Sequence, residues 1–169
     1  MSYHVFISYP RIADQRGAVS DIRAHLEREL QIKTGDKKLT VFLDQSHLSG
    51  GDPWSEALER EVRDADVLVL LLSPLWIASE WCRKELRLYL DHSQALDRDR
   101  PIIPLLWEET EPGDARTDEQ VELLELIRSR QIVPWVELRH QNSSYPGYFK
   151  AISELATVIK RKLPHDKRA

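Results

Sequence analysis

Short apolar runs alternate with amphipathic stretches along most of the chain. Consecutive β-branched, aromatic and aliphatic residues predict five buried strands, at residues 3–8, 39–44, 66–73, 101–107 and 132–138. Apolar residues at spacings of three and four predict helices at about residues 18–32, 55–65, 79–92, 121–129 and 149–163. Because a helix follows each strand, the pattern predicts a doubly wound, three-layer α/β fold, with a five-stranded parallel sheet flanked by helices.

Prolines mark one of these strands as different from the others. The run at 66–73 is apolar at every position between its ends, as expected for a strand that is covered on both faces. In contrast, Pro101 and Pro104 predict that residues 101–107 form an edge strand or lie near a strand end.

Helix starts are signalled by residues that cap free backbone N–H groups. For the second helix, Asp52 followed by Pro53 is favoured over Ser55 as the N-cap. For the third helix, Ser79 is a good N-cap and would fix where the helix begins.

The chain of 169 residues is long enough for one domain with its own core. We expect a single domain over residues 1–163, followed by a tail or the start of a linker at 164–169. The N-terminal MSYHVFISY lacks the features of a signal peptide, and the longest apolar run, VLVLLLSPLWIA, is too short to span a bilayer. These features predict a cytoplasmic protein with no membrane contact.

Charge and cysteine content exclude several kinds of site. The formal net charge of −4 argues against non-specific nucleic-acid binding by this domain. The single cysteine cannot form an intramolecular disulfide, and no Cys/His spacing resembles a zinc site, so no metal is expected.

Ligands of parallel α/β sheets bind beyond the carboxyl ends of the strands, so candidate residues should follow a strand or begin the next helix. The chain contains no GxGxxG after its first strand, no GxxxxGK[ST] and no GxSxG, which excludes the common dinucleotide, P-loop and hydrolase motifs. A receiver domain would need adjacent acids after the first strand, where this chain has Ser8, Tyr9, Pro10 and Arg11.

Three segments carry a further signal, in order and on the predicted elements. They are VFISYPR at the first strand, VFLDQSHLSGGDPW at the second strand and its loop, and LVLLLSPLWIASEWCRKEL at the third strand and helix. Together they resemble the Toll/interleukin-1 receptor (TIR) domain family, over residues 4 to about 160 and most loosely after residue 107. The resemblance implies a flavodoxin-like fold.

The resemblance also implies one of two functions. Many TIR domains are non-catalytic adaptors that act by binding other TIR domains. Bacterial, plant and some animal members instead cleave NAD+, with a catalytic glutamate in a W-x-x-x-E arrangement on the third helix. In this sequence the arrangement maps onto Trp81 and Glu85. NAD+ would then be the substrate, and no cofactor is expected.

One carboxylate suffices for such a reaction. Glycoside hydrolysis usually takes two, but the nicotinamide of NAD+ is a cationic pyridinium that leaves as a neutral molecule without an acid. A single glutamate can stabilise the oxocarbenium-like ribose that remains. The four-residue spacing puts Trp81 and Glu85 on one helix face, where the indole either walls the pocket or packs against the sheet. Without the resemblance, Glu85 would be interpreted as a solvated helix charge.

Other candidate substrate-binding residues also follow strands. Ser8, Tyr9 and Arg11 follow the first strand, and Arg11 either pairs with the phosphates of the dinucleotide or is a surface charge. Asp44 ends the second strand and either bonds a ribose or caps the next loop. Trp54 either lines the site or is buried in the core.

Three further residues attract attention. Trp107 is a candidate for the site lining or for a subunit contact. Cys82 is expected to be a small, buried packing residue, and His47 a loop residue.

These observations predict an NAD+ glycohydrolase that releases nicotinamide and either ADP-ribose or a cyclic isomer of ADP-ribose, with Glu85 as the catalytic residue. The resemblance further implies an effector of bacterial anti-phage immunity, activated by TIR–TIR self-association and accompanied by a fused or separate sensor domain. One alternative is a non-catalytic TIR adaptor. A more distant one is a nucleoside-processing transferase on a related α/β fold.

Overall fold

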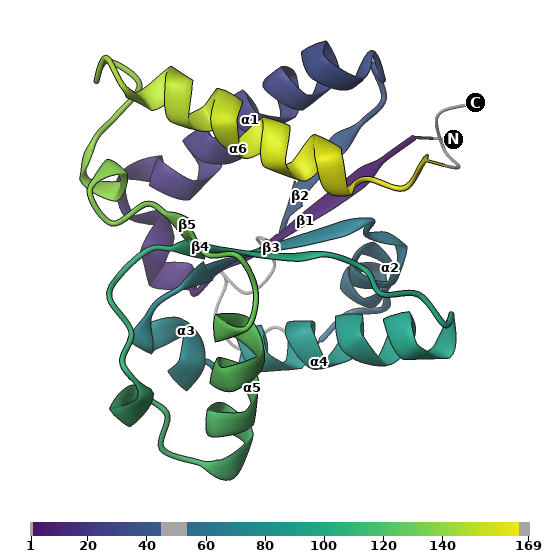
Figure 1. The fold of residues 1–169 in the computed structure, drawn as a ribbon, viewed down its shortest axis with the longest axis vertical. Helices are drawn as coiled ribbons and strands as arrows, with labels where there is room; N and C mark the ends of the chain where they lie inside the picture. Colours follow the sequence, from purple (N-terminus) through teal and green to yellow (C-terminus); the bar gives the residue numbers. More distant parts are fainter. Residues whose placement is uncertain (1, 45–53, 166–169) are drawn as a thin grey trace.

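The computed structural model describes residues 2–44 and 54–165. Its centre is a five-stranded, fully parallel sheet in the order β2-β1-β3-β4-β5 (Figure 1), which confirms the predicted architecture. The strands are β1 (His4–Ser8), β2 (Thr40–Leu43), β3 (Val67–Leu72), β4 (Ile102–Leu106) and β5 (Val133–Pro134).

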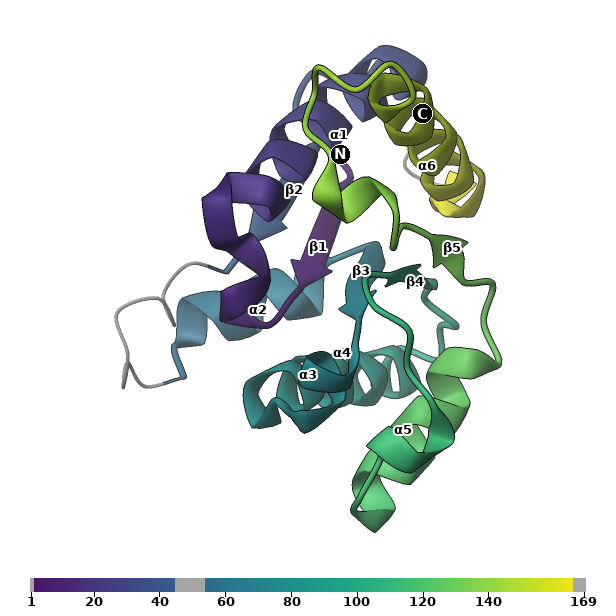
Figure 2. The same ribbon diagram turned by 90° about the vertical axis from the view of Figure 1, so that its left-hand side faces the viewer.

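Helices cover both faces of the sheet. In Figures 1 and 2, α1 and α6 lie side by side on one face, and α2, α3, α4 and α5 lie on the other. Successive side chains of β1 point to opposite faces of the sheet. Val5 and Ile7 pack into the hydrophobic cluster on the α1 side, and Phe6 packs into the cluster on the α4 side. The helices are α1 (Ala18–Thr34), α2 (Glu56–Asp64), α3 (Pro74–Ala78), α4 (Glu80–Ala95), α5 (Asp118–Arg128) and α6 (Tyr148–Lys162).

The strand order places a topological switch point between β1 and β3. The chain leaves β1 towards α1 on one face, whereas α2 packs on the opposite face. Loops that follow β1 and β3 therefore diverge at the carboxyl edge of the sheet, where ligands of such folds bind. Any site built by this edge should draw residues from the ends of these two strands.

The fifth strand is shorter than the predicted 132–138. It contains two residues, Val133 and Pro134, and the chain then turns into the 3₁₀ helix η4 (Leu138–His140). The backbone N–H of Trp135 still donates to the carbonyl oxygen of Leu106 at 3.1 Å, but the side chain of Trp135 packs into the core and the strand goes no further.

Residues 101–107 do not form an edge strand, although Pro101 lies at a strand end, directly before β4, as the alternative prediction had it. β4 lies between β3 and β5, but β5 reaches only Leu105 and Leu106. Pro104 is paired with Leu70 of β3 and lies before the first paired residue of β5, so its missing N–H interrupts no ladder on that side.

Residues 9–17, between the first strand and the first predicted helix, contain the 3₁₀ helix η1 (Arg11–Gly17). The carboxylate of Asp14 accepts hydrogen bonds from the backbone N–H groups of Val19 and Ser20, both at 2.9 Å, and so caps α1. Arg16 and Gly17 adopt left-handed φ values of 62° and 73°, which turn the chain into α1.

Serine residues cap three consecutive helices. Ser55 accepts from Leu58 N–H and α2 begins at Glu56, so the preference for Asp52 was wrong; Asp52 itself lies outside the described residues. Ser73 caps α3, a short helix that the sequence analysis did not predict. Ser79 caps α4 through Cys82 N–H, as predicted.

Arg100 is a buried cation at the amino edge of the sheet and is 5% exposed. Its guanidinium donates to the carbonyl oxygens of Arg63, Ala65 and Tyr89 and to Ser93 Oγ, at 2.7 to 2.8 Å. The same group lies 4.0 Å from the centre of the Tyr89 ring. Arg100 thereby joins the end of α2, the middle of α4 and the start of β4.

The two ends of the described chain meet beside β1. Tyr3 donates its hydroxyl hydrogen to the carbonyl oxygen of Pro164, at 3.2 Å. Across residues 2–44 and 54–165, no helix has the length and apolar character needed to cross a membrane.

Candidate active site

Glu85 is not a solvated helix charge. It lies on α4 and turns towards the carboxyl edge of the sheet, where its side chain is 2% exposed. A buried carboxyl group is uncommon unless it is hydrogen-bonded, because burial removes its solvation.

A hydrogen-bonded chain of three side chains holds this carboxyl group. Ser8, the last residue of β1, donates to Glu85 Oε1 at 2.8 Å. Trp76 of α3 in turn donates its Nε1–H to Ser8 Oγ at 3.1 Å. The chain joins the ends of β1 and β3 to α4, which places Glu85 at the switch point of the sheet.

The environment of Glu85 favours its neutral form. Burial raises the pKa of Glu85 well above the ordinary value of 4.5. The hydrogen bond from Ser8 acts in the opposite direction, and the nearby charge of Asp44 raises the pKa further. A carboxyl group whose pKa is shifted by burial in this way is typical of functional sites.

Trp81 packs against the end of β2. Its Nε1–H donates to Asp44 Oδ2 at 3.0 Å, and its ring lies 5.0 Å from that of Trp54. The ammonium group of Lys84 lies 4.3 Å from the centre of the Trp54 ring. Trp81 and Trp54 are both half-buried, so Trp81 holds its helix down while part of its surface stays accessible.

The remaining predicted site residues are Asp44, Tyr9 and Arg11. Asp44 is buried, and its backbone carbonyl oxygen accepts from the hydroxyl of Tyr9 at 2.9 Å. Burial, followed by the charges of Asp14, Asp44 and Glu85, raises the pKa of Tyr9. Arg11 is exposed at the start of η1. The structure thus brings Ser8 to Glu85 and links Tyr9 and Trp81 through Asp44.

Several sequence-based interpretations are now decided. Cys82 is buried, and burial raises the pKa of its thiol, so it packs as predicted. Trp107 is buried on the α1 side of the sheet, in the cluster opposite to that of Trp81. His47 lies outside the described residues. Within the described ranges, no group of three or more His, Cys, Asp or Glu residues is placed to bind a metal ion.

Trp76 is the site residue that the sequence analysis missed. The sequence signal was present, because Ser73 followed by Pro74 is a helix start, and the helix that it begins carries Trp76 into the site. The indole of Trp76 is fully buried and its N–H is satisfied by Ser8.

The parallel sheet with helices on both faces places the chain among the flavodoxin-like α/β domains. The chain belongs to the TIR domain family, because the family model for the TIR domain matches residues 5–152. The resemblance inferred from the three sequence segments is thereby confirmed.

Two curated relatives are similar to this chain. It is 27% identical over 168 residues to the NAD(+) hydrolase ApTIR of Actinoplanes sp., covering 92% of this chain and 23% of that protein. It is 29% identical over 112 residues to the probable 2′ cyclic ADP-D-ribose synthase BdTIR of Brachypodium distachyon, covering 66% of this chain and 43% of that protein. The chain thus spans less than half the length of either relative.

Solved structures agree with the fold. The crystal structure of the RPS4 and RRS1 TIR domain heterodimer matches with a TM-score of 0.54 at 14% identity, covering 96% of this chain and 99% of the other. A prokaryotic SEFIR domain matches with a TM-score of 0.53 at 22% identity, covering 93% and 92%. At these identities the likeness shows the fold alone.

Proposed function

We propose that this TIR domain cleaves the bond between nicotinamide and ribose in NAD+, with Glu85 as the catalytic residue. One observation carries the proposal: a glutamate in W-x-x-x-E spacing is buried at the switch point of a parallel sheet and hydrogen-bonded to Ser8. Ionisable groups with pKa values perturbed by burial cluster at functional sites. The names of two relatives, an NAD(+) hydrolase and a probable cyclic ADP-ribose synthase, also support it.

The proposed reaction begins with loss of nicotinamide. The bond between C1′ of the ribose and the pyridinium nitrogen breaks, and its electron pair leaves with nicotinamide, which becomes neutral. Ionised Glu85 stabilises the positive charge that develops on the ribose. The cationic substrate itself favours this ionised form, because an opposite charge nearby lowers the pKa of a carboxyl group.

The second step decides the product. Water attacks C1′ and releases a proton to Glu85 or to solvent, which gives ADP-ribose. Attack by a nucleophile within the same ADP-ribosyl group, with loss of its proton, gives a cyclic isomer instead. A carboxylate whose pKa is raised above its ordinary value is a stronger base for either proton transfer.

Substrate access requires a rearrangement, because Glu85 is 2% exposed and its Oε1 is occupied by Ser8. We assign this rearrangement to TIR–TIR self-association, so that the free domain is weakly active and the assembled domain is active. Partly exposed Trp81 would then wall the nicotinamide ribose, and Arg11 would bind the pyrophosphate. In this account the protein is an assembly-activated effector of bacterial anti-phage immunity that works with a fused or separate sensor domain.

The proposal is tested by incubating concentrated protein with NAD+, with and without a crowding agent, and measuring nicotinamide by chromatography. The expected result is nicotinamide release that rises more steeply than protein concentration. Release of nicotinamide in equal amount with ADP-ribose would identify hydrolysis, and a shortfall of ADP-ribose would identify cyclisation. No release from assembled protein would favour the non-catalytic adaptor.

A further inference from the structure

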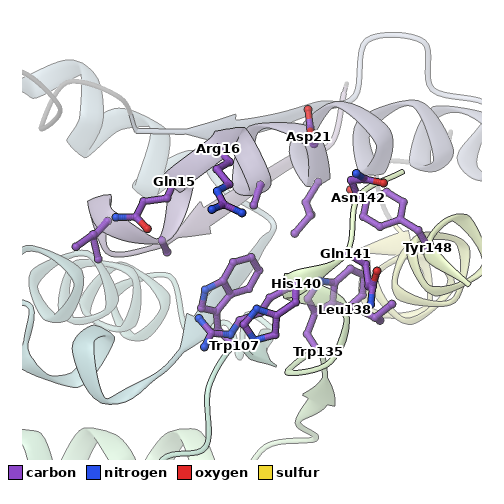
Figure 3. Close-up of a pocket in the computed structure, with 15 residues that line it drawn as sticks. Gln15, Arg16, Asp21, Trp107, Trp135, Leu138, His140, Gln141, Asn142 and Tyr148 are labelled. Carbon is purple, nitrogen blue, oxygen red and sulfur yellow. The ribbon is translucent and has the colours of Figure 1, made fainter. Parts of the chain in front are cut away.

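A cavity of about 520 Å³ opens at the carboxyl edge of the sheet, on the α1 and α6 side (Figure 3). Its walls come from η1 and the start of α1, from Trp107 after β4, from residues 135–142 after β5, and from Tyr148. Glu85, Ser8 and Trp76 do not line it. Its volume falls within the range of small-molecule sites.

Three donors that line this cavity have no hydrogen-bond partner among residues 2–44 and 54–165. They are the Nε1–H of Trp135, the hydroxyl of Tyr148 and the Nε–H of Arg139. Trp135 is 2% exposed and Tyr148 is 3% exposed. Unpaired buried donors are rare in native proteins, and these three lie within the walls of one cavity, where a small shift of the side chains on ligand binding would bring acceptor atoms within their reach.

Tyr148 is held in its donor form. Burial, followed by the charge of Asp21, raises the pKa of Tyr148 to about 12, so the hydroxyl keeps its proton at neutral pH. Asp21 itself is exposed, and in Figure 3 its carboxylate points away from the Trp107 side of the cavity. The Tyr148 hydroxyl therefore stays a hydrogen-bond donor at neutral pH.

Basic and aromatic groups face each other across the cavity. Figure 3 shows the guanidinium of Arg16 extending from η1 towards the indole of Trp107. Arg139 also lines the cavity, forms an ion pair with Glu108 and leaves its Nε–H unpaired. An indole surface beside an arginine fork suits a ligand with both a flat ring and an anionic group.

The position of Arg16 is fixed by the fold before any ligand binds. Its backbone is left-handed, with φ of 62°, a conformation that costs free energy for a residue other than glycine. Asp14 holds the connection in place by capping α1 at Val19 and Ser20. The fold thus keeps a strained backbone at Arg16, a residue that lines the cavity.

We propose that this cavity binds a nucleoside phosphate, at a site separate from Glu85. The base would lie against Trp107, the phosphate would pair with Arg16, and oxygens of the sugar or phosphate would accept from Trp135 and Tyr148. The products of NAD+ cleavage belong to this class. The inference does not depend on that reaction, because the lining residues exclude Glu85 and its hydrogen-bond partners.

The test is calorimetric titration of the Glu85→Gln variant and the wild type with AMP and with ADP-ribose, neither of which contains the bond that NAD+ cleavage breaks. Saturable binding with equal affinity in both proteins is expected. Inorganic phosphate and adenosine, titrated alone, should each bind more weakly than AMP. Phosphate binding as tight as that of AMP would overturn the assignment to a nucleoside phosphate.

Two substitutions and a control locate the ligand. Tyr148→Phe should weaken AMP binding by roughly 3- to 10-fold, the effect of one hydrogen bond, with no loss of stability, because the hydroxyl has no partner in the protein. Arg16→Ala should weaken it by roughly 10-fold or more. Arg161→Ala, an exposed change on α6, should bind as the wild type does.

Three results would overturn the proposal. One is the absence of saturable heat for AMP and ADP-ribose. Another is unchanged binding in both Tyr148→Phe and Arg16→Ala. The third is loss of AMP binding in Glu85→Gln, which would assign the ligand to the Glu85 site. None of these results depends on whether NAD+ is cleaved, so failure here is distinguishable from failure of the proposed catalysis.

Discussion

The indole N–H of Trp81 donates a hydrogen bond of 3.0 Å to the carboxylate of Asp44. This bond joins the first turn of α4 to the residue that follows β2. Because Asp44 also accepts from Tyr9 through its backbone carbonyl, the loops after β1 and β2 are both tied to the helix that carries Glu85. The W of W-x-x-x-E thus has a structural role that accounts for its spacing from the glutamate.

A double-mutant cycle measures this link. Trp81→Phe keeps an aromatic ring but removes the donor, and Asp44→Ala removes the acceptor. We expect each change to destabilise the protein, with a coupling free energy of roughly 1–3 kcal/mol, as for hydrogen bonds to charged groups. Urea unfolding of the four proteins gives the coupling, and strictly additive effects would show that the two side chains do not interact in solution.

Ser8 is expected to be the most sensitive small residue of the site. Ser8→Ala leaves both Glu85 Oε1 and the Nε1–H of Trp76 without their partner in a buried environment. We expect a loss of roughly 2–4 kcal/mol in the free energy of unfolding. Ser143→Ala, an exposed change, should stay within about 0.5 kcal/mol of the wild type. Equal effects of the two substitutions would show that Ser8 does not satisfy these groups.

The raised pKa of Glu85 gives a pH dependence with a definite sign. Folded protein retains a proton that the unfolded chain loses above pH 4.5, the ordinary pKa of the group. The free energy of unfolding therefore falls as pH rises from that value through the raised pKa of Glu85. Glu85→Gln cannot ionise, so its stability relative to the wild type should increase across the same interval.

Denaturant unfolding of both proteins at several pH values between about 5 and 8 checks this dependence. The hydrogen bond from Ser8 lowers the pKa of Glu85, so losing it in Ser8→Ala should move the pH-dependent interval upwards. A stability difference between wild type and Glu85→Gln that stays constant with pH would show that Glu85 ionises as easily in the folded protein as in the unfolded chain.

Substitutions of Arg100 test the buried hydrogen bonds at the amino edge of the sheet. Arg100→Met removes the guanidinium donor from the carbonyl oxygens of Arg63 and Ala65 and one of the two side-chain donors to the Tyr89 carbonyl oxygen, and should destabilise the protein by roughly 3 kcal/mol. Arg100→Lys keeps the charge but not the fork of donors, and should recover only part of the loss. The exposed control Arg98→Met should behave as the wild type does in thermal unfolding. Full recovery by lysine would show that charge alone matters.

Much of the fold was predictable because apolar runs of strand length and amphipathic helices alternate without interruption. The contact between Ser8 and Glu85 could not be predicted directly, because 77 positions separate the two residues. The sequence predicted only that both lie near the carboxyl edge of the sheet, where parallel strands end. Such contacts leave no local signal in the sequence. The same holds for Trp76, which lies 68 positions from its acceptor.

Local signals also failed where tertiary packing decided the outcome. Pro104 indicated an edge strand, but the pairing of β4 with β5 begins only at Leu105, which leaves room for Pro104 inside the sheet. Trp135 continued the apolar pattern of a strand, yet its side chain is buried beside the cavity and its indole Nε1–H is unpaired. That cavity gave no sequence signal, because its walls come from four separate segments of the chain.

The central claim is that Glu85 cleaves NAD+, and the most direct measurement is the initial rate of nicotinamide release. Wild type, Glu85→Gln and the exposed control Glu80→Gln on the same helix are compared at equal, high concentration, with folding verified by circular dichroism. The account predicts release by the wild type and by Glu80→Gln, and a loss of at least about 100-fold in Glu85→Gln, the scale of a missing electrostatic group. Equal rates for all three proteins would contradict it.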